Sequence, residues 1–152
     1  MYPNNFDDID AEIEKIRTEN KNLLKAFAEW LSEQGLARAT IKRHLSNIDF
    51  YINEFLVYSM PLTPQEGMEG GSVSMFLGFW FIRKTSWATK STIKTNAASL
   101  KKFGEFLYQR GVIDQEDRDS IIETIREEMP SWLSTLARYD DPDITDMEDI
   151  FL

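Results

Sequence analysis

The residues of this chain that could do chemistry are mainly cations, and they fall on two expected helices. One group lies in the lead-in and first turn of the earlier helix: Arg38, Lys42, Arg43 and His44. A second group, spaced by four and seven residues, lies along one stripe of the later helix: Lys90, Lys94 and Lys101. Cations on two helix faces could straddle the phosphates of a DNA duplex.

Three polar residues complete this candidate surface: Thr40, Asn47 and Ser91. Lysines on a helix face usually form only a solvated surface, so the stripe alone does not establish binding. Cations at a helix start oppose the helix dipole at a cost of about 0.5 kcal/mol each. Lys42 and Arg43 are therefore an unusual choice at that position, and they favour a functional interpretation.

The distribution of charge favours DNA more than the net charge does. The 152-residue chain carries a formal net charge of -9, which would by itself oppose nucleic-acid binding. Residues 36–110, however, hold ten Lys or Arg against five Asp or Glu, so the two flanks together hold -14. We interpret this asymmetry as a basic working surface between acidic ends.

Catalytic and cofactor sites are not expected. The chain has one histidine, His44, and no cysteine, which excludes thiolate zinc sites and a cysteine nucleophile. The glycines at 67–71 lack the Lys-Ser/Thr ending of a phosphate-binding loop, and the acids lack the spacing of a calcium loop. We predict no enzyme activity, no cofactor, no metal ion and no small-molecule substrate. His44 is expected to be a surface or helix-start residue rather than a general base.

A membrane partner is not expected either. The longest apolar cluster, at 75–82, is too short to span a bilayer. The first ten residues contain three Asp and no cation, unlike a signal or transit peptide. With no cysteine to stabilise in an oxidising compartment, a cytoplasmic location is predicted.

Apolar residues recur at helical spacing along most of the chain, and no stretch alternates as a strand would. The expected helices are 9–16, 21–34, 40–58, 72–82, 89 or 91 to 110, 114–128 and 131–138. Gly35 and Gly111 are expected to end two of them. With 42% hydrophobic residues for a core, the prediction is one all-α domain, an orthogonal bundle of about five main helices.

Local chemistry gives further expectations for particular residues. Thr40, Ser72 and Asp114 are expected to cap helix starts, and Pro130 to interrupt the last helical region. Phe50 lies opposite the apolar stripe of its helix, so it either packs beneath the 9–16 segment, the favoured alternative, or marks a contact surface. The contiguous aromatic residues at 79–81 are expected in the core.

Three segments between residues 23 and 113 set the order of these features. They are FAEWLSEQGLARATIKRHLSNIDFYINEFL, an apolar helix at 73–82, and TKSTIKTNAASLKKFGEFLYQRGVI. This order resembles the SAM-like, core-binding N-terminal domain of tyrosine recombinases and phage integrases. Together with the charge pattern of the two ends, it predicts a division into an acidic leader with a short helix (1–20), a helical core-binding-like domain (21–138) and an acidic mobile tail (139–152).

The resemblance also implies a function. By analogy, the starts and solvent faces of the second and fourth helices, those that carry the two cation groups, would grip double-stranded DNA. The catalytic residues of that family sit on a separate domain, and nothing in this chain matches them, so the expectation is a non-catalytic DNA-binding module.

The alternative is a protein-interaction adaptor that has lost DNA binding. It would dock partners through residues 140–152, where five apolar residues recur among acids: Ile144, Met147, Ile150, Phe151 and Leu152. An acidic segment of this kind is more usually only solvating.

Overall fold

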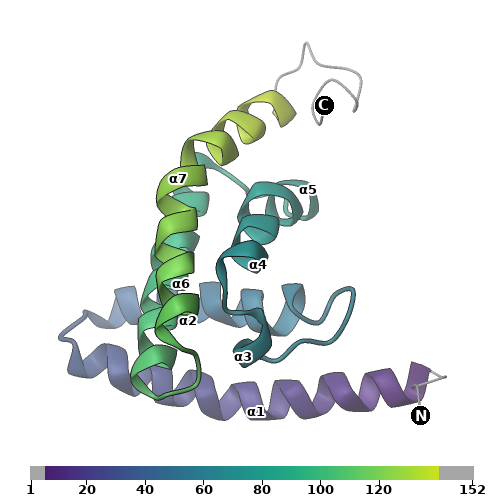
Figure 1. The fold of residues 1–152 in the computed structure, drawn as a ribbon, viewed down its shortest axis with the longest axis vertical. Coiled ribbons are helices and arrows are strands. Elements are labelled where there is room, and N and C mark those ends of the chain that lie inside the picture. The colour runs from purple at the N-terminus through teal and green to yellow at the C-terminus, as the bar shows by residue number, and fades with distance from the viewer. Residues whose placement is uncertain (1–5, 141–152) are drawn as a thin grey trace.

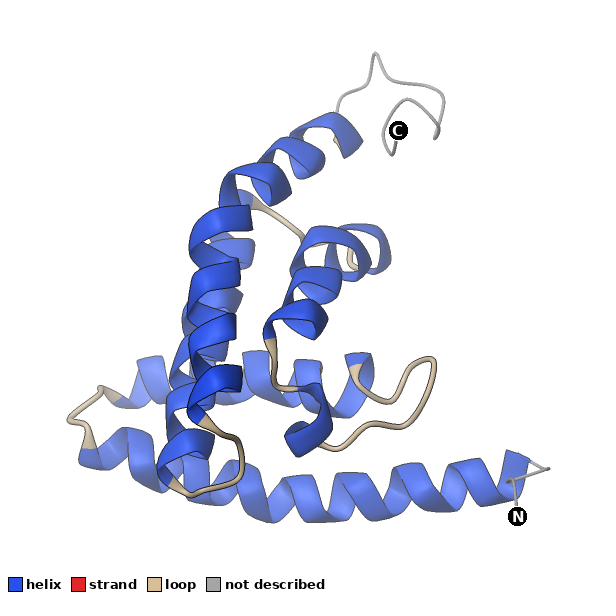
Figure 2. Cartoon of the chain, in the orientation of Figure 1, coloured by secondary structure: helices blue, strands red, loops and turns tan. Residues whose placement is uncertain are grey.

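The computed structural model describes residues 6–140, which form helices joined by loops and contain no strand (Figures 1 and 2). The predicted all-α class is confirmed. The elements are α1 (Phe6–Glu33), α2 (Arg38–Phe50), η1 (Tyr51–Phe55), α3 (Pro64–Gly67), α4 (Gly70–Met75), η2 (Phe76–Trp80), α5 (Phe81–Lys84), α6 (Lys90–Gln109) and α7 (Gln115–Tyr139). Except for Tyr139 and Asp140, the predicted acidic tail lies outside the described residues.

Two of the helices include a π-helical turn: α2 ends in η1, whereas α4 continues through η2 into α5. In η1 the Leu56 amide donates to the Tyr51 carbonyl at 3.0 Å, and in η2 the Phe81 amide donates to the Phe76 carbonyl. The two turns face each other, because the Tyr51 and Phe76 ring centroids are 4.9 Å apart. The elements α4, η2 and α5 are therefore one helix over residues 70–84, and α2 with η1 is one helix over 38–55.

The helices form two antiparallel hairpins that lie across each other (Figure 1). One hairpin is α1 with α2, the other is α6 with α7, and the helix 70–84 packs beside α7. Aromatic rings join the hairpins, with Phe27 of α1 at 5.1 Å from Phe103 and 5.3 Å from Phe106 of α6. This crossing is the arrangement expected of an orthogonal bundle.

The helix ends that depend on local backbone chemistry agree with the sequence. Gly35 and Gly111 follow α1 and α6 with φ of 82° and 74°, a left-handed conformation that glycine adopts at low cost. Thr89 forms a reciprocal capping box with Thr92 at the start of α6. Asp114 caps α7 by accepting from the Asp117 amide at 2.8 Å.

Several predicted boundaries are wrong. The 9–16 and 21–34 segments belong to the single helix α1, because Asn20 between them is buried and donates to the Asn53 side chain of η1 at 2.9 Å. Similarly, α7 continues through Pro130, since Trp132 and Leu136 beyond it are buried. Figure 1 shows α7 bending in its last turns, as a proline inside a helix would cause.

Two predicted caps are also wrong. The helix with Thr40 begins at Arg38, after Ala37, and has no side-chain cap. Ser72 lies inside α4, whose start is capped by the Glu69 carboxylate through the amides of Gly71 and Ser72. A carboxylate also complements the positive end of the helix dipole, so it caps more strongly than a hydroxyl would.

The aromatic residues are placed differently from the prediction. Phe50 packs on Trp80, at 5.6 Å between ring centroids, and on Trp87, at 5.8 Å, rather than beneath the N-terminal helical turns. Of the residues at 79–81, Phe81 is buried as predicted, but Phe79 is 47% exposed. These contacts join segments far apart in the sequence, so helical spacing alone does not reveal them.

Small residues allow the helix 70–84 to approach α7 closely. A Cβ on Gly70 would collide with Thr124, and one on Gly78 would lie 2.6 Å from the Trp132 indole nitrogen. Between them, the Ser74 hydroxyl donates to the Glu128 carboxylate at 2.6 Å. The residue numbers of these pairs increase along both helices in steps of four, from Gly70 with Thr124 to Gly78 with Trp132. The two helices therefore run parallel in a fixed register.

Replacing Gly78 with Ala should destabilise the fold. Trp132 is only 3% exposed and has little freedom to move away, so the added methyl overpacks the interface. We expect the free energy of unfolding in urea to fall by about 1–3 kcal/mol. The control is Gly71→Ala in the same helix, where a Cβ meets only the Glu69 side chain, and equal stability of both variants would contradict the close packing.

Candidate nucleic-acid interface

A buried polar contact joins α2 to α6 where they cross. The Ser99 hydroxyl oxygen lies 2.7 Å from Nδ1 of His44 and accepts from the Asn47 side-chain amide at 3.0 Å. The same hydroxyl donates to the Thr95 carbonyl at 3.0 Å. Because a hydroxyl has one proton to donate, His44 must be the donor to Ser99, which assigns the proton of the neutral ring to Nδ1.

His44 lies in the second turn of α2 and is only 5% exposed, so of the two predicted alternatives the surface position is wrong. Burial lowers the pKa of its imidazole, and the positive charges of Lys102 and Arg43 lower the pKa further. His44 is therefore a neutral structural residue at pH 7 and cannot offer a charge to phosphate. Helical spacing did not reveal this, because the burying partner comes from α6.

Most of the other predicted residues lie at the surface. The exposed ones are Arg38, Lys42, Arg43, Lys90, Ser91, Lys94 and Lys101. Thr40 and Asn47 are half-buried, and Asn47 is tied to Ser99. The structure therefore brings the two predicted helices into contact and leaves their cations accessible.

Within residues 6–140, the exposed cations of α2 and α6 are not neutralised by ion pairs with neighbouring acids. The arginines that do pair with Asp or Glu at the surface include Arg17 and Arg118, which lie on α1 and α7. Neither α2 nor α6 has an acid in its first turn. A positive potential is therefore expected along the exposed faces of α2 and α6.

The lysine stripe of α6 does not adjoin the α2–α6 crossing and forms no single row with the cations of α2. Successive residues of a helix are rotated by about 100°. Lys90, Lys94 and Lys101 therefore lie on the opposite side of α6 from Ser99, which contacts α2. Lys102 is about 60° from Ser99 and lies near His44, so it is the α6 cation closest to α2.

Sequence reasoning missed Lys102 and Ser99. Ser99 carried a signal, since it is a polar residue close to the apolar stripe of its helix. Lys102 carried none, because its importance depends on the partner helix.

Other kinds of site receive no support from residues 6–140. In that part of the chain no group of three or more His, Asp or Glu side chains is placed to hold a metal ion. None of its helices combines the length and hydropathy needed to cross a membrane. Comparison with protein-family models, with curated proteins and with solved structures finds no match for this chain.

The stability of the protein should depend on pH through His44. Its pKa is lowered in the folded state from an ordinary value near 6.5, so the unfolded state binds the proton more readily. The free energy of unfolding should be highest above about pH 6.5 and fall as pH decreases, by at most about 1.4 kcal/mol per unit. Urea unfolding between pH 5.5 and 7.5 measures this. His44→Gln should flatten the profile, and an unchanged slope would show that His44 is not responsible.

The placement of Lys102 has its own test. Lys102→Ala should raise the pKa of His44, because one of the two positive charges that oppose protonation is removed. The imidazole NMR titration reports this without interference, since the chain has one histidine. Lys101→Ala is the matched control and should have a smaller effect. Equal shifts in the two variants would mean that Lys102 does not face α2.

Proposed function

We propose that this chain is a non-catalytic DNA-binding module that holds duplex DNA through α2 and α6. The observation that carries the proposal is the contact of these two cation-bearing helices at Ser99, with their lysines and arginines exposed and without ion pairs among the described residues. The contacts expected are with phosphate oxygens, which position a protein on DNA without reading its sequence.

The electrostatics of the crossing support a polyanionic ligand. Arg43 and Lys102 both disfavour a positive charge on His44, so the cations near the crossing also repel one another. A DNA duplex presents one phosphate charge about every 1.7 Å of its axis, and it releases condensed counterions when lysines and arginines replace them. Binding would thus relieve repulsion in the protein and gain entropy from the released ions.

The residues we assign to phosphate contact are the exposed members of the predicted set, together with Lys102. They are Arg38, Lys42, Arg43, Ser91, Lys90, Lys94, Lys101 and Lys102. Thr40 and Asn47 are half-buried, so they can contact phosphate only through the exposed part of their side chains. His44 is buried and stabilises the crossing instead of contacting DNA. The order of sequence segments shared with the core-binding domain of tyrosine recombinases is consistent with this proposal.

Duplex binding measured against salt concentration tests the proposal. The logarithm of the affinity should fall linearly with the logarithm of salt concentration. Replacing Lys90, Lys94 and Lys101 with Ala should weaken binding and make the slope shallower by up to about 2.7, which is about 0.9 for each phosphate that the variant no longer neutralises. Fluorescence anisotropy with a labelled duplex provides both quantities.

A matched control distinguishes this surface from general surface charge. Lys15, Lys21 and Lys25 are three exposed lysines on α1, and their replacement by Ala removes the same charge. The control should leave most of the salt slope in place. Binding that is absent, insensitive to salt or equally reduced by both triple variants would reject the α2–α6 interface.

A further inference from the structure

An apolar groove lies beside the helix 70–84, on residues that the DNA proposal does not use. It has a volume of about 500 Å³ and is formed by the chain after η1 and by one face of η2 and its neighbours. Four of its apolar side chains are strongly exposed: Tyr58 (58%), Met60 (68%), Met75 (53%) and Phe79 (47%). A contiguous patch of this kind usually marks a binding surface.

Two cations border this groove. The Arg83 guanidinium lies 3.2 Å from the centre of the Phe79 ring, and the Lys84 ammonium lies 5.1 Å from the centre of the Tyr58 ring. Glu69, the acid in the groove lining, is engaged by the amides of the α4 start. The groove therefore suits an occupant that combines apolar side chains with negative charge.

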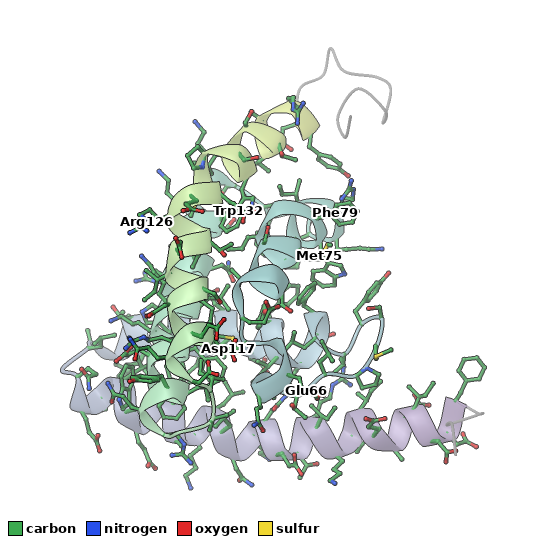
Figure 3. The ribbon with its side chains drawn as sticks, in the orientation of Figure 1. Glu66, Met75, Phe79, Asp117, Arg126 and Trp132 are labelled. Carbon is green, nitrogen blue, oxygen red and sulfur yellow. The ribbon has the colours of Figure 1, made fainter. Side chains whose placement is uncertain are left out.

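The parallel register of the two helices brings the end of α7 to this place. Phe79 and Met75 also line the space between η2 and α7, together with Thr135, one turn before the end of α7. Burial lowers the pKa of the Arg83 guanidinium, while the nearby Tyr139 opposes that change. In Figure 3 Phe79 and Met75 lie on one side of their helix.

The chain that follows has the matching chemistry. Residues 141–152 contain five acids and five apolar residues, Ile144, Met147, Ile150, Phe151 and Leu152, and no cation. Twelve residues reach at most about 40 Å when fully extended. That length is ample, because the groove shares Met75 and Phe79 with the neighbouring space that Thr135 of α7 also lines. Attachment to α7 also gives this segment a high effective concentration at the groove, which a separate partner lacks.

We propose that residues 141–152 bind in this groove of the same chain, with their apolar side chains against Met60, Met75 and Phe79 and their acids toward Arg83 and Lys84. This inference goes beyond DNA binding and does not depend on it. The docked segment would cover the exposed apolar patch and place its acids near the two cations in the last turn of the helix 70–84.

Photo-crosslinking in the full 152-residue chain tests the inference. The photoreactive residue p-benzoyl-L-phenylalanine replaces Phe151, and mass spectrometry locates the residues that it captures. We expect a product of monomer mass with crosslinks in residues 58–60 and 75–79. Phe79→Ser should lower the yield several-fold, and Ile122→Ser, at an exposed position of α7 outside the groove, should leave it within about two-fold.

Three outcomes would overturn the inference. Crosslinks elsewhere in the chain would place the segment on another surface, and crosslinks between two chains would show binding in trans. A yield unaffected by Phe79→Ser would show that the groove is not the site. Circular dichroism checks that each variant is folded, and Met60→Ser, in a loop, repeats the test should Phe79→Ser fail to fold.

Discussion

The Ser99 hydroxyl and the two side chains bound to it fix how the α1–α2 hairpin crosses the α6–α7 hairpin. Serine is short enough for α2 and α6 to approach closely, and buried polar groups must keep their hydrogen bonds, so His44 and Asn47 can be satisfied in only a few relative positions of the helices. The aromatic contacts of α1 with α6 are compatible with the same crossing. A nonspecific hydrophobic contact would hold the hairpins together but would leave their angle less defined.

A second constraint comes from the small residues of the helix 70–84, which determine how closely this helix packs on α7. Its physical cause differs from that of the crossing. At the crossing, directional hydrogen bonds define the geometry. At α7, the absence of side chains at Gly70 and Gly78 lets two backbones come together, and dispersion between close surfaces stabilises the contact. The first constraint places the cations of α2 and α6. The second sets the register of α7 against the helix 70–84.

The sequence was a good guide wherever one residue determines the backbone near it. Gly35 and Gly111 end helices because of their φ angles, and Thr89 and Asp114 start them through their own oxygens. Sequence reasoning was wrong where a structural feature depends on contacts with a segment far away in the chain. Pro130 does not break α7, because burial of Trp132 and Leu136 against other helices outweighs the missing hydrogen bond. For the same reason His44, which is buried against α6, was predicted at the surface, and Lys102 was not included in the candidate surface.

Because the chain has a single histidine, the pKa of His44 can be measured directly and responds to the charges around the crossing. The net charge of -9 describes the potential far from the molecule, whereas His44 responds to the charges within a few ångströms, and these are Lys102 and Arg43. Salt screens both effects, but it screens a partly buried pair less than it screens distant acids on α1 and α7. Burial is the main cause of the lowered pKa of His44, and the positive charges of Lys102 and Arg43 lower it further, so these cations act on the crossing at close range in an acidic protein. A phosphate backbone, which binds at that same range, would experience the local cations before the opposing net charge.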